Sequence, residues 1–161
     1  ESPPHAQATL DRFSNMLRYQ LYECSDDQVA LDKEINYLKN YIEIERMRKT
    51  EDLILKMDFD ANLKHHKIAP FLLQPLVENA FKHLGGTPEI EIEGKMQAST
   101  FTFQVKNAVD TIKTQAMDSG GIGLANLRRR LTLLYPETHQ LRIQQEAHFF
   151  KVVLELELNA S

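Results

Sequence analysis

The stretch Leu72-Leu-Gln-Pro-Leu-Val-Glu-Asn-Ala-Phe-Lys-His83 decides how the rest of the chain is interpreted. Successive side chains on a helix are turned by about 100°. One contiguous arc of such a helix carries only apolar side chains, namely Leu73, Leu76, Val77, Ala80, Phe81 and Leu84. The opposite arc carries Glu78, Asn79, Lys82 and His83. The stretch therefore predicts an amphipathic helix whose apolar arc is buried against a sheet.

The polar arc of this predicted helix holds a carboxylate, an amide, a cation and an imidazole at a spacing where helical side chains meet. A carboxylate can orient or deprotonate an attacking group. An amide oxygen is a hard, neutral ligand suited to Mg²⁺, which usually keeps several waters and binds substrate phosphates. Lysine supplies a mobile point charge for phosphate. The arc fits a magnesium–nucleotide site, but the solvated side of an ordinary surface helix has the same composition.

Length and composition restrict the class of protein. The chain has 161 residues, which fits one domain with its own core and a short appendage. A formal net charge of −4 gives no broad basic surface for nucleic acid. Cys24 is the single cysteine, which precludes a disulfide within the chain and favours a reducing compartment. No apolar run approaches the roughly 20 residues of a membrane-spanning helix.

Periodicity predicts two helices before the central stretch. Leu10, Phe13, Leu17 and Leu21 recur at helical steps, which predicts a helix over about 5–22. A second helix, over 29–48, is apolar over so wide an arc that it needs two packing partners. One partner is expected to be the sheet. The other is either the first helix or a second copy of the chain.

Alternation of apolar and polar residues predicts the strands. The alternating runs lie at 53–59, 89–94, 101–107, 140–144 and 149–158. The predicted fold is a two-layer α/β sandwich: a mixed sheet of about five strands is covered by helices at 29–48, 70–84 and 123–135. The helix at 5–22 is expected to project from it as a stem. Pro75 would crowd the carbonyl of Phe71, so an irregular first turn is expected in the helix at 70–84.

A glycine-rich turn, Ser119-Gly-Gly-Ile-Gly-Leu124, leads directly into the helix at 123–135. Glycines at a helix start let backbone N–H groups approach a phosphate, and the helix dipole favours the anion. The preceding segment, 108–119, has small and polar residues without periodicity, which predicts a loop able to serve as a lid. Arg128, Arg129 and Arg130 cannot all point one way, and the sequence leaves open which of them reaches phosphate.

These motifs carry a family resemblance. Gln74-Pro-Leu-Val-Glu-Asn-Ala-Phe-Lys-His83 resembles the N box of the GHKL, or Bergerat-fold, ATPases, and more narrowly that of the LytS-like bacterial sensor histidine kinases. The run from Gly121 to Leu131 is similar to the second glycine box of that group. Leu17-Arg-Tyr19 and Tyr41-Ile-Glu-Ile-Glu-Arg46 resemble its entry to the catalytic domain. The resemblance implies that 1–27 is the end of a dimerisation region and 28–161 an ATP-binding catalytic domain.

The resemblance implies an enzyme that transfers the γ-phosphoryl group of Mg-ATP to a histidine. Asn79 would ligate Mg²⁺, and Glu78 would orient or deprotonate the attacking imidazole. Lys82 and His83 would steady the phosphates, although His83 is equally consistent with a residue near the helix C-terminal dipole. The remaining nucleotide contacts would come from Asn107 at adenine and from Gly121, Gly123, Leu124 and Arg128.

The chain departs from the family pattern at two places. Val105-Lys-Asn-Ala-Val109 stands where the family has an aspartate followed by glycines, so Asn107 replaces the aspartate. An amide can still accept a hydrogen bond from adenine, but without charge, which predicts a weaker contact. Ser119 replaces the first glycine of the second glycine box. No run resembles the phosphoacceptor motif, and His5 does not match it, so the fragment is expected not to autophosphorylate.

Partners and alternatives follow from the same resemblance. It implies a homodimer in the full-length protein, a cognate response regulator of the LytTR type, and no direct contact with nucleic acid. It also implies a cytoplasmic segment of a bacterial inner-membrane protein that reaches the membrane only through upstream segments. Two other functions remain open: a non-catalytic dimerisation scaffold with an eroded nucleotide site, and a GHKL ATPase without a histidine substrate.

Overall fold

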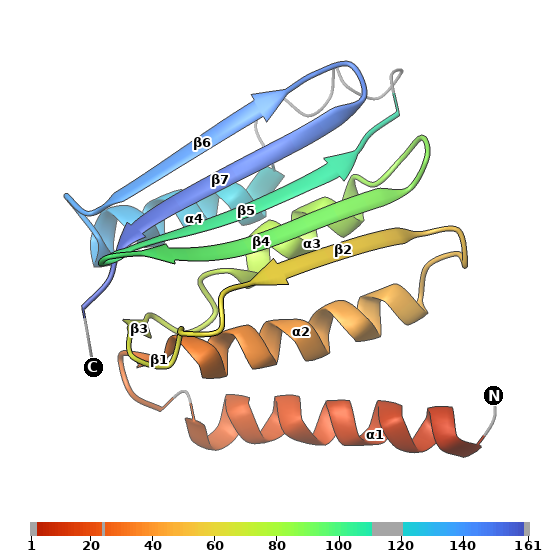
Figure 1. Cartoon of the computed structure of the whole chain (residues 1–161), viewed down its shortest axis with the longest axis horizontal. Helices are drawn as coiled ribbons and strands as arrows, with labels where there is room; N and C mark the ends of the chain where they lie inside the picture. Colours follow the sequence, from red (N-terminus) through yellow and green to blue (C-terminus); the bar gives the residue numbers. More distant parts are fainter. Residues whose placement is uncertain (1–2, 24, 111–120, 160–161) are drawn as a thin grey trace.

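The computed structural model describes residues 3–23, 25–110 and 121–159. A five-stranded sheet with the order β2-β4-β5-β7-β6 forms one layer (Figure 1). Its strands are β2 (Ile54–Phe59), β4 (Glu89–Gln97), β5 (Thr100–Ala108), β6 (His139–Gln145) and β7 (Phe149–Glu157). β2 and β4 pair parallel, and every other pair is antiparallel. The predicted mixed sheet of five strands is therefore confirmed.

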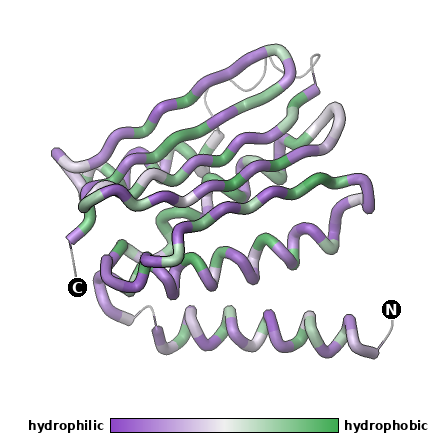
Figure 2. Tube along the Cα trace, in the orientation of Figure 1, coloured by the Kyte–Doolittle hydropathy of each residue, from purple (hydrophilic) through white to green (hydrophobic). Residues whose placement is uncertain are grey.

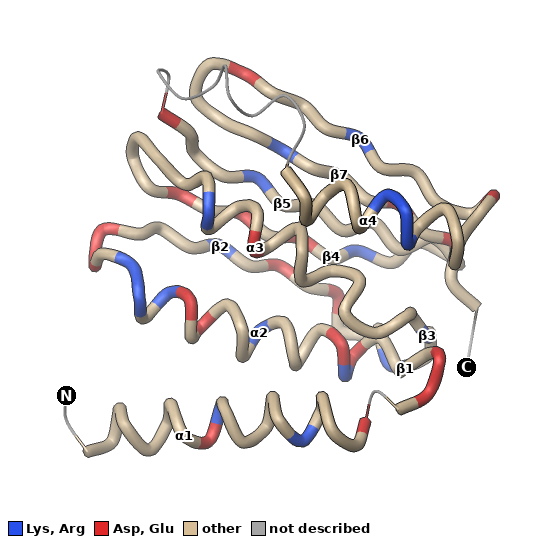
Figure 3. The backbone as a smooth tube through the Cα atoms, turned by 180° about the vertical axis from the view of Figure 1, so that it is seen from behind, with Lys and Arg blue, Asp and Glu red and all other residues tan. Residues whose placement is uncertain are grey.

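Three helices form the second layer on one face of the sheet (Figures 1 and 3). They are α2 (Leu31–Met47), α3 (Gln74–Lys82) and α4 (Gly121–Leu134). Hydrophobic and hydrophilic residues alternate along the strands, as the colours of Figure 2 show, so that one face of the sheet is apolar and meets the helices. The buried side chains on that face include Ile90, Ile92, Phe101, Phe103, Val152 and Leu154. The predicted two-layer α/β sandwich is confirmed.

The opposite face of the sheet carries charged side chains in cross-strand pairs. Lys56 Nζ lies 2.8 Å from Glu89 Oε1, and Lys95 Nζ lies 2.6 Å from Asp58 Oδ2. Exposed pairs of this kind contribute little to stability because water already solvates both charges. The sheet thus has one apolar face, which α2, α3 and α4 cover.

The N-terminal stem consists of α1 (Pro3–Arg18) and a π-helical turn, η1 (Tyr19–Glu23). It runs antiparallel to α2 on the side away from the sheet (Figure 1). Thr9 Oγ1 lies 3.6 Å from Met47 Sδ, and Gln20 Nε2 donates to the hydroxyl of Tyr37 at 3.0 Å. The other side of the stem is an apolar stripe, 47–67 % exposed, made of Leu10, Phe13, Leu17 and Leu21.

Two short strands were not predicted. β1 (Val29–Ala30) pairs antiparallel with β3 (Lys67–Ile68), and Leu31 N donates to His66 O at 2.8 Å. As a result α2 begins at Leu31, two residues after the expected start. A two-residue pairing between segments far apart in the chain has no periodic signal of its own, because only the tertiary fold brings the segments together.

The central helix is shorter than predicted. α3 begins at Gln74 and ends at Lys82, so residues 70–73 precede it, and the expected range of 70–84 was wrong. Pro75 occupies the first turn, where its missing N–H costs nothing. Phe71 has a φ of +60°, which ends any helical path through it. The irregular turn expected before Pro75 is therefore present, and it excludes 70–73 from the helix.

Candidate functional site

The four polar residues predicted on α3 do not share one environment. Glu78 and Lys82 are exposed and His83 is half-buried, whereas Asn79 is only 7 % exposed. α3 packs against both β5 and α4, so part of its polar arc faces the neighbouring helix. The structure therefore brings the amide of Asn79 into the protein and leaves the carboxylate of Glu78 accessible at the surface.

Glu78 is oriented by the residue one turn before it. Gln74 Nε2 donates to Glu78 Oε1 at 3.0 Å. The charge of Glu78 also affects Tyr41 on α2. Burial raises the pKa of the Tyr41 phenol, and the negative charges of Glu45 and Glu78 raise it further. Gln74 and Tyr41 were not identified from the sequence, since neither has a spacing that distinguishes it from a surface or core residue.

His83 ends α3, and its backbone N–H donates to the carbonyl of Asn79 at 3.1 Å. Burial, followed by the positive charge of Lys82, lowers the pKa of the His83 imidazole below its usual value. The ring is therefore favoured in its neutral form, with one N–H donor. Its position at the helix end agrees with the sequence interpretation that placed it near the C-terminal dipole.

The turn after α3 lies against the end of β5. Gly85 N donates to Ala108 O at 3.1 Å. A Cβ on Gly85 would lie 2.8 Å from Asp110 N, so only glycine allows this close approach. Asn107 is 1 % exposed, and its Nδ2 donates to Ala108 O at 3.1 Å. Asn107 and the C-terminal end of α3 are thereby held at the same edge of the fold.

The glycine-rich start of α4 is open on its outer side. Gly121 has a φ of +69°, and a Cβ at Gly121 or Gly123 would meet no described atom within 4 Å. Leu124 is fully buried and anchors the first turn, and Arg128 is exposed. Ser119 and most of the predicted lid at 108–119 fall within 111–120, outside the described residues.

The three consecutive arginines at 128–130, the basic stretch of α4 in Figure 3, have different surroundings. Arg130 Nη1 donates to Phe71 O at 3.2 Å, and its Nη2 donates to Pro70 O at 3.0 Å. Arg128 and Arg129 are exposed. Arg130 therefore holds the backbone that leads into α3, which leaves Arg128 and Arg129 as the arginines accessible to a ligand.

The buried position of Glu34 was also not identified from the sequence. It is 1 % exposed on α2, three residues after Leu31 and four before Leu38. A carboxylate within an apolar helical stripe was the available signal, because ionised side chains are almost never fully buried without partners.

The comparisons with known proteins agree with this architecture. The family described as Histidine kinase matches residues 1–53. Sensor protein kinase HptS of Staphylococcus aureus (strain USA300) is 26 % identical over 156 residues, covering 88 % of this chain and 30 % of HptS. The chain thus spans about a third of the length of the curated relatives it matches.

Solved structures share the fold at low sequence identity. The histidine kinase domain of a blue-light activated kinase from Erythrobacter litoralis has a TM-score of 0.62 at 10 % identity and covers 93 % of this chain and 73 % of its own. The histidine kinase AdeS of Acinetobacter baumannii has a TM-score of 0.59 at 12 % identity, with coverages of 97 % and 78 %. The described residues contain no helix long and apolar enough to cross a membrane. By sequence the chain is similar to sensor histidine kinases, and by fold it has the architecture of solved histidine kinase catalytic domains.

Proposed function

We propose that the chain is the ATP-binding catalytic part of a two-component sensor histidine kinase, which transfers the γ-phosphoryl group of ATP to a histidine. The observation that carries this proposal is the packing of α3 beside α4. It places the helix with Glu78, Asn79, Lys82 and His83 next to a helix whose glycine-rich start is open to a ligand. Residues 1–27 would be the end of the dimerisation region and 28–161 the catalytic domain.

The residues present fit a magnesium–nucleotide complex. Asn79 offers a buried amide oxygen, the type of ligand Mg²⁺ accepts. Among residues 3–23, 25–110 and 121–159, no group of three or more His, Cys, Asp or Glu side chains could hold a metal ion. A cation at Asn79 would therefore depend on phosphate oxygens and water for its other ligands, as Mg²⁺ commonly does. When bound, it would neutralise charge on the phosphates.

The other side chains have complementary roles in this proposal. Backbone N–H groups at Gly121 and Gly123, with the α4 dipole, would hold the phosphates. Lys82 and Arg128 would add positive charge, and neutral His83 would donate one hydrogen bond. Leu124 would fix the first turn of α4 by its burial.

The adenine end and the γ-phosphoryl end of ATP would be served by different elements. Asn107, with Nδ2 committed to Ala108 O, would present its amide oxygen to the adenine amino group. Glu78, oriented by Gln74, would accept a hydrogen bond from the attacking imidazole or remove its proton. The exposure of Glu78 leaves room for that incoming histidine.

Replacing Asn79 by alanine is expected to lower Mg-ATP affinity at least tenfold, because a metal ligand is lost. Calorimetric titration of the chain with ATP, with and without Mg²⁺, measures this effect. Asn36→Ala is the matched control, since Asn36 is exposed on α2 beside the stem. Absence of binding to the folded wild-type chain at millimolar Mg-ATP would reject the kinase proposal and favour the non-catalytic scaffold.

The proposed partner on the stem is a second copy of this chain. Leu10, Phe13, Leu17 and Leu21 form a continuous apolar stripe on the side of α1 and η1 away from α2, and such a stripe is typical of helices that pack on helices. Downstream, we expect a response regulator of the LytTR type to receive the phosphoryl group. The membrane would be reached through segments upstream in the full-length protein.

Leu17→Lys is expected to shift the chain from dimer towards monomer, because it places a charge in the centre of the stripe. Sedimentation velocity over a concentration series measures the shift. Asp11→Lys is the control, since Asp11 is exposed on the same helix but lies outside the stripe. Equal association of wild type and Leu17→Lys would show that the stripe is not the dimer contact.

A further inference from the structure

The segment 69–72, which leads into α3, has its backbone polar groups held by side chains from other elements. Ala69 N donates to the hydroxyl of Tyr135, just after α4, at 2.9 Å. The carbonyls of Pro70 and Phe71 accept hydrogen bonds from Arg130 on α4. The backbone amides of Phe71 and Leu72 lower the pKa of the Glu34 carboxyl on α2. Both sides of this short segment are thus held, one by α2 and the other by α4.

The stem reaches the same carboxylate. The hydroxyl of Tyr19, in η1, donates a hydrogen bond to Glu34 Oε2. Burial raises the pKa of Glu34 to about 7, while the Tyr19 hydroxyl, the amides of Phe71 and Leu72 and the charge of Arg130 lower it. The negative charge of Glu34 also contributes to raising the pKa of the Tyr135 phenol. Tyr19 is therefore one of the few groups that favour the ionised form of this buried carboxyl.

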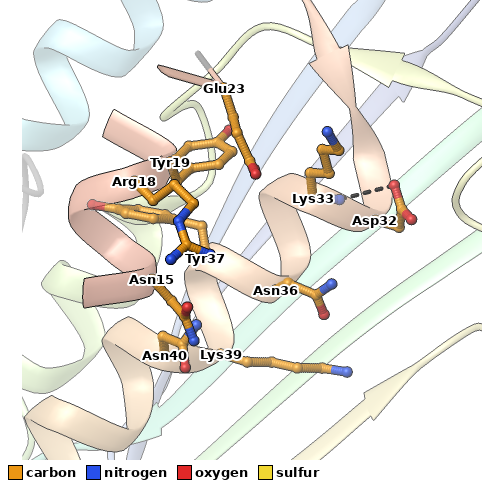
Figure 4. Close-up of a pocket in the computed structure, with 10 residues that line it drawn as sticks. All are labelled: Asn15, Arg18, Tyr19, Glu23, Asp32, Lys33, Asn36, Tyr37, Lys39 and Asn40. Atoms are coloured by element: carbon orange, nitrogen blue, oxygen red, sulfur yellow. Dashed lines mark hydrogen bonds between the residues drawn. The ribbon is translucent and has the colours of Figure 1, made fainter. Parts of the chain in front are cut away.

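Aromatic packing joins the stem to Phe71 as well. The rings of Tyr19 and Tyr37 are stacked with centroids 4.7 Å apart (Figure 4). Phe71 packs edge-on against both, at 5.5 Å from Tyr19 and 5.3 Å from Tyr37. Because Phe71 has a φ of +60°, a costly conformation for a residue with a large side chain, its backbone depends on these surroundings to persist.

The side of this network towards the stem borders an open cleft. A hollow of about 600 Å³ lies between the stem and α2, with Tyr19 and Tyr37 in its wall beside Arg18 and Asn40 (Figure 4). Because this hollow separates much of η1 from α2, the two elements share only a small contact area around Tyr19. The other members of the network, Glu34, Phe71 and Arg130, belong to the proposed catalytic domain and not to the stem.

We propose that Glu34 is a positioning residue for the nucleotide site, and that through Tyr19 the stem sets how firmly Glu34 holds the segment 69–72. The proposal rests on the proposed function, since the site it positions is the nucleotide site of α3 and α4. With Tyr19 in place, its hydroxyl and the amides of Phe71 and Leu72 together favour the ionised form of Glu34. If the stem turns and withdraws Tyr19, Glu34 takes up a proton and becomes a weaker acceptor. The segment then loosens, and α3 shifts relative to α4.

Nuclear magnetic resonance of the nucleotide-free chain tests the first step. The amide protons of Phe71 and Leu72 are expected to titrate with the pKa of Glu34, near 7 in the wild type. In Tyr19→Phe, which keeps the ring but removes the donor, this titration moves to higher pH and amide hydrogen exchange at both residues accelerates. Tyr37→Phe is the control, because its hydroxyl accepts from Gln20. Identical titration in wild type and Tyr19→Phe would overturn the proposal.

Mg-ATP binding by the same variants at pH 7 tests the coupling to the site. Tyr19→Phe is expected to raise the Kd roughly fivefold or more, the lower end of ordinary coupling between sites, and Tyr37→Phe to leave it unchanged. Altered amide titration with an unchanged Kd would overturn the link between Glu34 and the nucleotide site. If the wild type binds no nucleotide, the proposed function fails, while the amide titration still decides whether Tyr19 controls Glu34.

Discussion

Replacing Glu78 by glutamine is expected to lower phosphoryl transfer to histidine by about 10²–10⁴-fold while leaving Mg-ATP affinity nearly unchanged, which is the range for loss of a general base. Glutamine keeps the size of the side chain and can still pair with Gln74. It cannot remove a proton from the attacking imidazole. Because Glu78 is exposed, the substitution leaves the core intact.

The measurement is acid-labile phosphate formed from labelled ATP in the full-length protein, where the proposed function places the acceptor histidine, alongside calorimetric ATP binding. Glu45→Gln is a matched control: it removes a carboxylate that, like Glu78, raises the pKa of Tyr41, but it lies on α2. Transfer at the wild-type rate would show that Glu78 is not the base. Parallel loss of binding and transfer would make it a nucleotide-binding residue.

Glu34 is expected to make the stability of the chain fall as pH rises through neutrality. Burial raises the pKa of Glu34 from 4.5 to about 7 in the folded protein. Between these pH values the folded chain binds more protons at this site than the unfolded chain does, so the free energy of unfolding decreases with pH. The contribution is present in full below about pH 4.5 and is lost above about pH 7; it amounts to about 3 kcal/mol.

Urea unfolding at intervals from pH 5 to pH 8 checks this result. The difference in unfolding free energy between wild type and Glu34→Gln should change by about 2–3 kcal/mol over this interval, most of the full contribution, because pH 5 lies slightly above the unfolded pKa. His83 makes the free energy of unfolding rise with pH instead. Burial lowers the pKa of its imidazole, so the folded state favours the neutral form that becomes populated as pH rises. His83→Gln should therefore steepen the decline. A pH-independent difference between wild type and Glu34→Gln would contradict the buried-carboxylate assignment.

Repeating patterns along the chain predicted most of the fold. Alternation identified the five strands, and the apolar arc of Leu76, Val77, Ala80 and Phe81 correctly predicted that α3 packs on the sheet. The start of α3 was wrong because a non-local network, Arg130 and Glu34 on the backbone of 70–72, stabilises a non-helical path there. No local propensity encodes contacts made across such a distance in the chain.

The candidate site divides in the same way. The kinds of groups on α3, and the glycines before α4, are visible in the sequence because each motif is contiguous. The burial of Asn79 could not be predicted from the sequence. A helical-wheel analysis assumes one buried side, whereas α3 contacts β5 on one side and α4 on another. The roles of Gln74 at Glu78 and of Arg130 at Pro70 also required coordinates.

By itself the sequence determined the layer architecture, the order of the helices and strands, and the chemical groups available for a nucleotide. Those properties follow from local periodicity and composition, which each segment carries wherever it lies. Only the tertiary structure decided that Glu34 would be buried against Tyr19, Phe71 and Arg130. That environment is assembled from four segments of the chain. Their burial of one carboxyl raises its pKa to about 7, although Tyr19, the amides of Phe71 and Leu72 and the charge of Arg130 act in the opposite direction.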